Sequence, residues 1–154
     1  AIFPCGKEVP QKKDFPKVYS WLSTTSQNAK IIELPIYNWN MWPYTQNEIW
    51  REYYSTLHYR KMVNGYSGFS PPAWQKMIVE VMSGFPSEES TSYLRDIGIN
   101  YIIIHKREFD ILYKEKFMVN GHMMRSGGEI IDISYNNKSM SLIEQFGDDY
   151  VFAL

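Results

Sequence analysis

Five polar side chains have the types and spacing expected of a ligand site at one edge of a sheet. Glu33 lies within an apolar, β-branched segment, and His105 directly follows another. Asn64 belongs to an Asn-Gly turn signal after a shorter segment, and His58 and Tyr66 lie in the adjoining stretches. Ligand sites in open α/β sheets form outside the carboxyl ends of the strands. We therefore expect these residues to lie near one such edge.

A carboxylate, an amide and two imidazoles that converge on one edge would bind a polar ligand or a loop of a partner, because together they offer both hydrogen-bond donors and acceptors. The alternative is a structural role. In that case Glu33 and the histidines would only satisfy buried backbone groups of an irregular, aromatic-rich loop. The sequence leaves both interpretations open.

Other kinds of site are disfavoured. The loop at residues 34–40 has no glycine, and the chain has no Gly-x-x-x-x-Gly-Lys-Ser/Thr motif, so no nucleotide cofactor is expected. The three histidines are far apart and Cys5 is the only cysteine, so no metal site is expected. The stretch at residues 65–69 lacks the second glycine of a nucleophile elbow in register, and no catalytic residue is predicted. The acids of 148–149 are expected to be solvated turn residues.

The composition narrows the classes of partner. The chain has 16 basic and 17 acidic side chains and no basic stripe, so nucleic acid is not an expected partner. No apolar run approaches the roughly 18–20 residues that would cross a bilayer. Aromatic residues make up 16% of the chain and are crowded between Trp39 and Trp74. They predict a well-packed core, with a sugar- or lipid-facing surface as the alternative.

The elements that must position these side chains alternate along the chain. Apolar periodicity predicts an α/β fold: a mostly parallel sheet flanked by helices, Rossmann-like without a nucleotide loop, that ends in an antiparallel C-terminal hairpin. Residues 1–16 are expected to be an extended lead-in, and 17–154 a single α/β domain. Strands are expected at 31–35, 61–63, 99–104, 140–146 and 150–154.

Three stretches are harder to assign. Residues 46–57 fit both a helix and an alternating strand, and we favour the helix. Residues 108–119 are predicted to be helical and 120–128 to be a flexible, glycine-rich loop. Residues 129–135 are predicted to form a strand.

The chain resembles a known group of proteins over nearly its whole length. It is similar to the C-terminal soluble domain of bacterial polytopic membrane proteins related to GT-C-type glycosyltransferases, the dolichyl-phosphate-mannose mannosyltransferase-like group. The most specific element is Asn-Gly-Tyr-Ser-Gly-Phe at 64–69. Segments 18–22, 32–35, 54–58, 63–71, 85–86, 94–98, 101–105 and 146–152 carry the resemblance in that order.

This resemblance implies transmembrane helices before residue 1 and a position on the extracytoplasmic face of the cytoplasmic membrane. The expected partners are the transmembrane portion of the same chain and a carbohydrate or polyprenyl-phosphate-linked sugar. The catalytic acid of that group lies in the membrane portion, so none is expected here, and no cofactor is implied. The domain would then be a non-catalytic accessory of a glycosyltransferase. The alternative is a binding or assembly module of a membrane protein without sugar chemistry.

Overall fold

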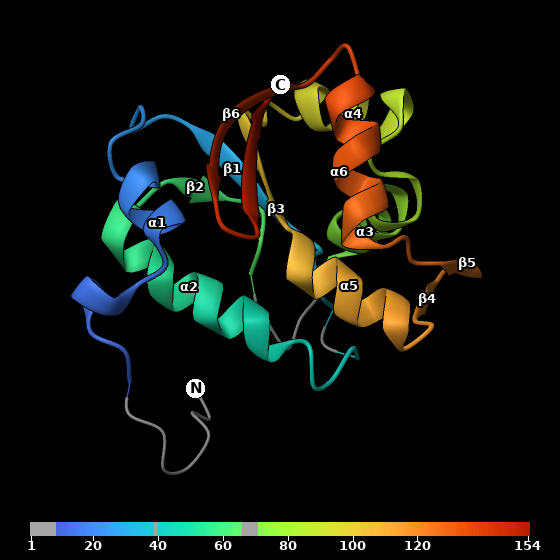
Figure 1. The fold of residues 1–154 in the computed structure, drawn as a ribbon, viewed down its shortest axis with the longest axis horizontal. Coiled ribbons are helices and arrows are strands. Elements are labelled where there is room, and N and C mark those ends of the chain that lie inside the picture. The colour runs from blue at the N-terminus through green and yellow to red at the C-terminus, as the bar shows by residue number, and fades with distance from the viewer. Residues whose placement is uncertain (1–8, 39, 66–70) are drawn as a thin grey trace.

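A five-stranded sheet in the order β2-β1-β3-β7-β6 forms the centre of the molecule. The computed structural model describes residues 9–38, 40–65 and 71–154, and Figure 1 shows the sheet between two groups of helices. The sheet strands are β1 Lys30–Leu34, β2 Lys61–Met62, β3 Tyr101–His105, β6 Ser141–Phe146 and β7 Asp149–Ala153. The helices are η1 Lys12–Asp14, α1 Lys17–Leu22, α2 Gln46–His58, α3 Pro72–Gly84, α4 Glu88–Asp96, α5 Lys106–Lys114 and α6 Gly127–Asn136.

The pairing of the strands confirms the predicted fold class. β1 pairs in parallel with both β2 and β3, and in the pairing with β3, Glu33 lies opposite Ile103. β7 adds to β3 in antiparallel orientation, and β6 completes the C-terminal hairpin. The parallel register brings the carboxyl ends of β1 and β3 to the same edge, where Glu33 and His105 lie.

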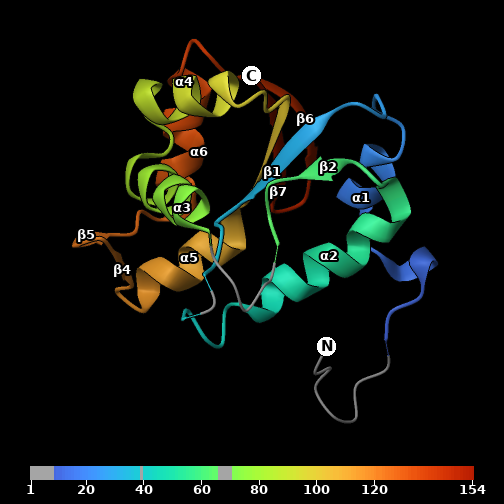
Figure 2. The same ribbon diagram turned by 180° about the vertical axis from the view of Figure 1, so that it is seen from behind.

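Alternation along the strands divides the core into two layers. On one face, α1 and α2 cover Ile31, Ile103 and Val151. On the other face, α3, α4, α5 and α6 cover Ile32, Leu34, Ile102, Ile104 and Phe152. Figure 2 shows these two helical groups on opposite sides of the sheet. Because Glu33 alternates with Ile32 and Leu34, its side chain points into the layer beneath α1 and α2.

The stretch whose assignment was ambiguous is a helix, as favoured from its sequence. α2 spans Gln46–His58, and its buried side chains include Glu48 and Arg51, one turn apart. Tyr59 ends the helix in the left-handed conformation, with φ of 52°. The helix therefore presents charged side chains to the sheet, which the apolar spacing of Ile49, Tyr53 and Leu57 did not predict.

The predicted strand at 129–135 is wrong, because these residues form α6. Ser126 caps this helix by accepting a hydrogen bond from the amide of Glu129, and a Ser-x-x-Glu sequence is a helix-start signal. Ile130, Ile131 and Ser134 are buried on one face at helical spacing. The β-branched isoleucines favoured a strand locally, and packing against the core overrode that preference.

The predicted helix at 108–119 starts earlier and ends sooner, since α5 is Lys106–Lys114. The segment expected to be a flexible loop instead contains part of a second, two-stranded sheet of β4, Met118–Val119, and β5, His122–Met123. Asn120 and Gly121 connect them with positive φ values of 50° and 77°. Two such residues in succession give the turn that matches the twist of a hairpin.

The part of the lead-in that the structure describes packs on the domain. It contains η1, Phe15 is buried, and the Tyr53 hydroxyl donates a hydrogen bond of 2.9 Å to the Pro10 carbonyl. Within the described residues, no helix is both long and apolar enough to cross a membrane.

Candidate functional site

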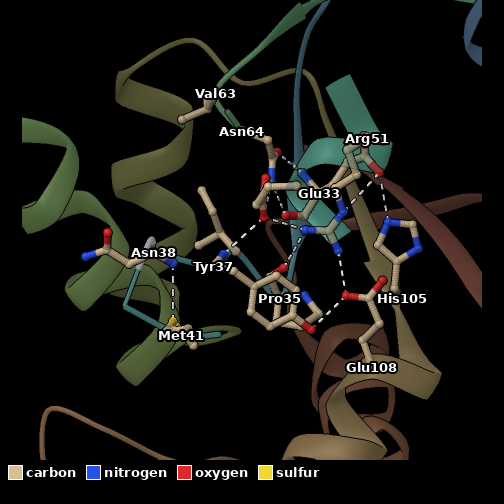
Figure 3. A network of polar contacts seen from close by, with 12 residues as sticks. Glu33, Pro35, Tyr37, Asn38, Met41, Arg51, Val63, Asn64, His105 and Glu108 are labelled. Carbon is tan, nitrogen blue, oxygen red and sulfur yellow. Dashed lines mark hydrogen bonds and ion pairs between the residues drawn. The ribbon is translucent and has the colours of Figure 1, made fainter. Parts of the chain in front are cut away.

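Glu33 is the centre of a buried polar network at the carboxyl end of β1. Its Oε2 atom accepts a hydrogen bond from the Tyr19 hydroxyl at 2.8 Å and lies 2.8 Å from Nε2 of His105. The Nε atom of Arg51 lies 3.6 Å from the same oxygen. Glu33 is fully buried, and Figure 3 shows His105 and Arg51 converging on it. One carboxylate thus joins α1, α2 and two strands.

Asn64 extends the edge of β1 beyond the short strand β2. Its Oδ1 atom accepts from the Glu33 amide at 2.6 Å, and its Nδ2 donates to the Glu33 carbonyl at 2.8 Å. The side chain therefore takes the place of a neighbouring strand. The Nδ2 atom of Asn64 also donates a hydrogen bond of 3.2 Å to Oε2 of Glu48.

Arg51 is buried and meets three carboxylates. Its Nη1 donates to Oε1 of Glu48 at 2.6 Å and to the carbonyl of Pro35 at 2.8 Å. Its Nη2 donates to Oε2 of Glu108 at 2.7 Å, while Nε faces Glu33. A guanidinium has five N–H donors in a fixed planar arrangement and can serve several acceptors at once. Arg51 therefore fastens α2 to the loop after β1 and to α5.

The loop after β1 is held by two of these carboxylates. The Tyr37 amide donates to Glu48 at 3.0 Å, and the Tyr37 hydroxyl donates to Glu108 at 2.8 Å. The guanidinium carbon of Arg51 lies 5.4 Å from the centre of the Tyr37 ring. Figure 3 shows Tyr37 and Glu108 on the same side of Arg51.

His105 connects the buried network to the surface. Its Nδ1 atom lies 2.7 Å from Oδ1 of Asp149 on β7, and its Nε2 faces Glu33. Asp149 was expected to be solvated, but its side chain is only 23% exposed because it pairs with His105. The antiparallel register places these two residues directly opposite each other.

Burial and the contacts within the network shift the pKa values of Glu33 and His105. Burial opposes a charge on His105, yet the hydrogen bonds to Asp149 and Glu33 raise its pKa to about 10. Burial alone would raise the pKa of Glu33, but the hydrogen bond and charge of His105, with Arg51 and Tyr19, hold it below its usual value. His105 is therefore a cation at neutral pH, and both ring nitrogens donate to carboxylates.

Glu48 behaves differently from Glu33. Burial raises the pKa of Glu48, and Arg51 and the donors from Tyr37 and Asn64 only partly offset that effect. Burial also raises the pKa of the Tyr19 and Tyr37 hydroxyls. The negative charge of Glu33 raises the pKa of Tyr19 further, and that of Glu108 raises the pKa of Tyr37 further. Both phenols therefore remain hydrogen-bond donors at any physiological pH.

The structure places Asn64 and His105 in contact with Glu33, and a ligand or partner at this edge stays a prediction. His58 lies apart: its Nδ1 accepts from the Arg60 amide at 2.9 Å, and its ring stacks on Tyr19 with centroids 6.1 Å apart. Burial lowers the pKa of His58. Tyr66 lies outside the described residues, so its place in this group stays a prediction.

A shallow pocket of about 250 Å³ opens beside the network. Tyr19, Arg51 and His105 form part of its wall, and Glu108 and Asp149 lie within it with 22% and 23% of their side chains exposed. The other lining residues are Pro16, Asn47, Trp50 and Tyr54. The pocket combines aromatic surface with partly exposed carboxylates, and such a surface suits a hydroxyl-rich or cationic group.

The sequence reasoning missed Arg51, Glu48, Glu108 and Asp149. Charged residues one turn apart on a helix are usually a solvated pair. Only the docking of α2 on the sheet turned Glu48 and Arg51 inward. The sequence held one signal that these two side chains could face the sheet. Glu48 and Arg51 lie at helical spacing, beside the apolar positions of the same helix.

The charged side chains of this network hold one another in place. Among the residues that the structure describes, no group of three or more His, Cys, Asp or Glu side chains is placed to hold a metal ion. The buried cations each contact at least two acceptors, so they brace the strand edge. The groups that can meet a ligand are those at the pocket.

Fold and site together define an α/β domain whose strand-end edge is braced by an internal ion network. In a comparison with solved structures, the chain is similar to the C-terminal globular domain of an oligosaccharyltransferase from Archaeoglobus fulgidus, with a TM-score of 0.53 and 12% identity. The similarity covers 96% of this chain and 99% of that one. At this identity it shows a common fold. No protein-family model matches the chain, and no curated protein matches it.

Proposed function

We propose that this chain is the extracytoplasmic accessory domain of a membrane glycosyltransferase that uses a lipid-linked sugar, and that it catalyses nothing by itself. The observation that carries the proposal is the end-to-end likeness to the globular domain of an oligosaccharyltransferase. The likeness covers 96% of this chain and 99% of that one, so it involves the arrangement of most strands and helices rather than a single βα unit. A fold does not by itself imply a function, so the geometry of the site is the second observation that supports the proposal.

The site is built for holding a ligand rather than for reaction. Arg51 and His105 each face more than one carboxylate, so the charges of both are already occupied within the protein. The partly exposed Glu108 and Asp149 offer acceptors at the pocket, next to the aromatic surface of Trp50 and Tyr54. Hydroxyl groups of a sugar ring suit such acceptors.

Charge restricts which part of a lipid-linked sugar this pocket would contact. Two cations, Arg51 and His105, face four carboxyl groups, those of Glu33, Glu48, Glu108 and Asp149. This surplus of negative charge repels a phosphate group. The pocket would therefore contact sugar hydroxyls of donor or acceptor, with the phosphate held elsewhere in the parent protein.

The test uses the full reading frame that encodes this chain. Membranes containing the full-length protein, and membranes containing a version without residues 17–154, are given a radiolabelled polyprenyl-phosphate sugar. We expect transfer by the first only, and none by residues 1–154 alone. A parent with a single anchor helix and no transfer would contradict the proposal and favour the binding or assembly module.

The pocket is tested separately by NMR titration of residues 1–154. We expect methyl glycosides to shift amides near Glu33, Asn64 and His105, and a sugar phosphate to shift them less. Glu108→Gln should weaken the shifts, whereas Glu144→Gln on the exposed strand β6 should leave them unchanged. Absence of shifts with every sugar would remove the ligand site and leave the network with a structural role.

A further inference from the structure

The charged donors in the wall of the pocket beside the ion network are already used within the protein. Each of the three guanidinium nitrogens of Arg51 faces a carboxylate, and both ring nitrogens of His105 face carboxylates as well. A ligand that only accepts hydrogen bonds therefore finds these donors occupied. A ligand that brings its own donors has a better match.

Two carboxylates in the same wall each keep one oxygen for such a ligand. The contacts described for Glu108 use its Oε2 atom, and Figure 3 shows the one from Arg51. The contact described for Asp149 uses its Oδ1 atom. Both side chains line the pocket and are partly exposed. Oε1 of Glu108 and Oδ2 of Asp149 therefore remain as acceptors.

The charge of the network favours a positive ligand. Its two cations face four carboxyl groups, and three negative charges remain even when Glu48 is protonated. Glu33 also has a second oxygen, Oε1, that is buried and has no hydrogen-bond partner among the described residues. The pocket is therefore negative overall.

The cations that are neighbours in sequence do not cancel this charge at the pocket. Lys106 follows His105, and its ammonium group pairs with Asp110 at 2.9 Å. Four other basic residues are exposed and are not part of the lining, so water and salt screen them. They are Lys12, Lys13, Lys17 and Arg107.

Aromatic rings line the same pocket. The rings of Trp50 and Tyr54 stack with centroids 6.0 Å apart. Tyr19 continues the row, with its ring centroid 4.7 Å from that of Tyr54. The face of an aromatic ring carries partial negative charge and attracts a cation, and it also packs against an apolar surface. Carboxylates and aromatic faces together suit an organic cation.

An ammonium group fits this wall better than a metal ion does. Over the described residues, no cluster of His, Cys, Asp or Glu is arranged as a metal site. An ammonium group has three donors and no acceptor, so it complements open carboxylate oxygens. Hydrogen bonds between two charged groups are roughly twice as strong as those between neutral groups.

We propose that the pocket selects an amino sugar, with its protonated amine on Glu108 and Asp149 and its ring against Trp50 and Tyr54. This inference rests on the proposed function, which supplies the sugar, and it adds the class of sugar. The same ammonium group occurs at the end of a lysine side chain, so the test includes both sources.

The test is NMR titration of residues 1–154 at about pH 6, where an aliphatic amine is protonated. The three probes are glucosamine, its uncharged counterpart N-acetylglucosamine, and Nα-acetyl-lysine amide. We expect glucosamine to bind roughly fivefold more tightly than N-acetylglucosamine. This preference should shrink as salt is added, and glucosamine should also bind more tightly than the lysine amide.

Variants assign the preference to the two carboxylates. Glu108→Gln and Asp149→Asn should each bring the two sugar affinities within about twofold of each other, because each removes one charge from the pocket. Glu144→Gln, on the exposed strand β6, should keep the full preference. Trp50→Leu should weaken both sugars by a similar factor. Unchanged amide shifts of Ile102 in the core show that a variant is folded.

The outcomes separate this inference from the proposed function. Equal affinity for the charged and the uncharged sugar overturns the selection of an amino sugar and leaves a sugar site in place. Tighter binding of the lysine amide than of glucosamine also overturns it, since the ammonium group would then come from a protein segment. Absence of shifts with all three probes removes the ligand site, whereas the transfer assay in membranes still decides the accessory role.

Discussion

The imidazole of His105 and the carboxylate of Glu33 meet at 2.8 Å across two adjacent parallel strands. Both residues come from segments that are otherwise apolar, and both are buried. A charged pair at this place is held by its surroundings: Asp149 occupies the other ring nitrogen, and Tyr19 and Arg51 approach the same carboxylate. The pair makes the edge of the sheet sensitive to pH.

The free energy of unfolding should therefore decrease as the pH becomes alkaline. The folded protein raises the pKa of His105 from 6.5 to about 10, so the stabilisation is complete below pH 6.5 and is lost as the pH rises through about 10. Each pKa unit corresponds to about 1.4 kcal/mol, so the loss is on the order of a few kcal/mol. Urea unfolding from pH 6 to 10.5 measures it.

His105→Gln should flatten this alkaline decline, because the glutamine does not titrate. His122→Gln, at the exposed strand β5, is the matched control and should keep the decline of the unaltered chain. A decline of the same size in both variants would mean that another group causes it.

Removing Arg51 should strongly destabilise the domain. Arg51→Met leaves Glu33, Glu48 and Glu108 without their shared cation, and breaking a buried ion pair typically costs about 3–5 kcal/mol. Thermal and urea unfolding measure this loss. Lys76→Met removes an exposed cation that lies 3.6 Å from Glu80 and should change stability by less than about 1 kcal/mol.

Asn64 should protect the edge of β1 from opening. Asn64→Ala removes both hydrogen bonds to the backbone of Glu33 and leaves buried groups unsatisfied, at a cost of about 1–3 kcal/mol. Hydrogen exchange of the Glu33 amide should accelerate in this variant. Asn100→Ala, which removes the bond to the Lys30 amide at the exposed start of the same strand, should leave Glu33 exchange unchanged.

Two adjacent glycines of α6 should respond oppositely to alanine. A Cβ at Gly127 would overlap the carbonyl of Lys106, so Gly127→Ala should destabilise by about 1–3 kcal/mol. A Cβ at Gly128 meets nothing within 4 Å, so Gly128→Ala should stabilise slightly, by about 0.5–1 kcal/mol, through helix propensity. Thermal unfolding of both variants gives the comparison, and equal effects would contradict it.

Local patterns predicted much of the architecture. The apolar runs of β1 and β3 indicated buried parallel strands, and the glycine turn near 147 indicated the C-terminal hairpin. The same patterns failed at 129–135, where three isoleucines suggested a strand although Ser126 and Glu129 carried a helix-start signal. At 120–121 the Asn-Gly pair between β4 and β5 was a hairpin signal, which the glycine-rich surroundings obscured.

That Glu33, Asn64 and His105 lie at or near the carboxyl ends of strands followed from the sequence, and the parallel pairing of β1 with β2 and β3 brings those ends to one edge. The partners of those residues did not follow. Tyr19 and Arg51, which both approach the Glu33 carboxylate, come from two different helices, and whether a helical side chain faces solvent or sheet depends on how its helix docks, which the linear order does not contain. Segments distant along the chain therefore converge on one carboxylate only through packing, and that convergence sets the charge of the edge.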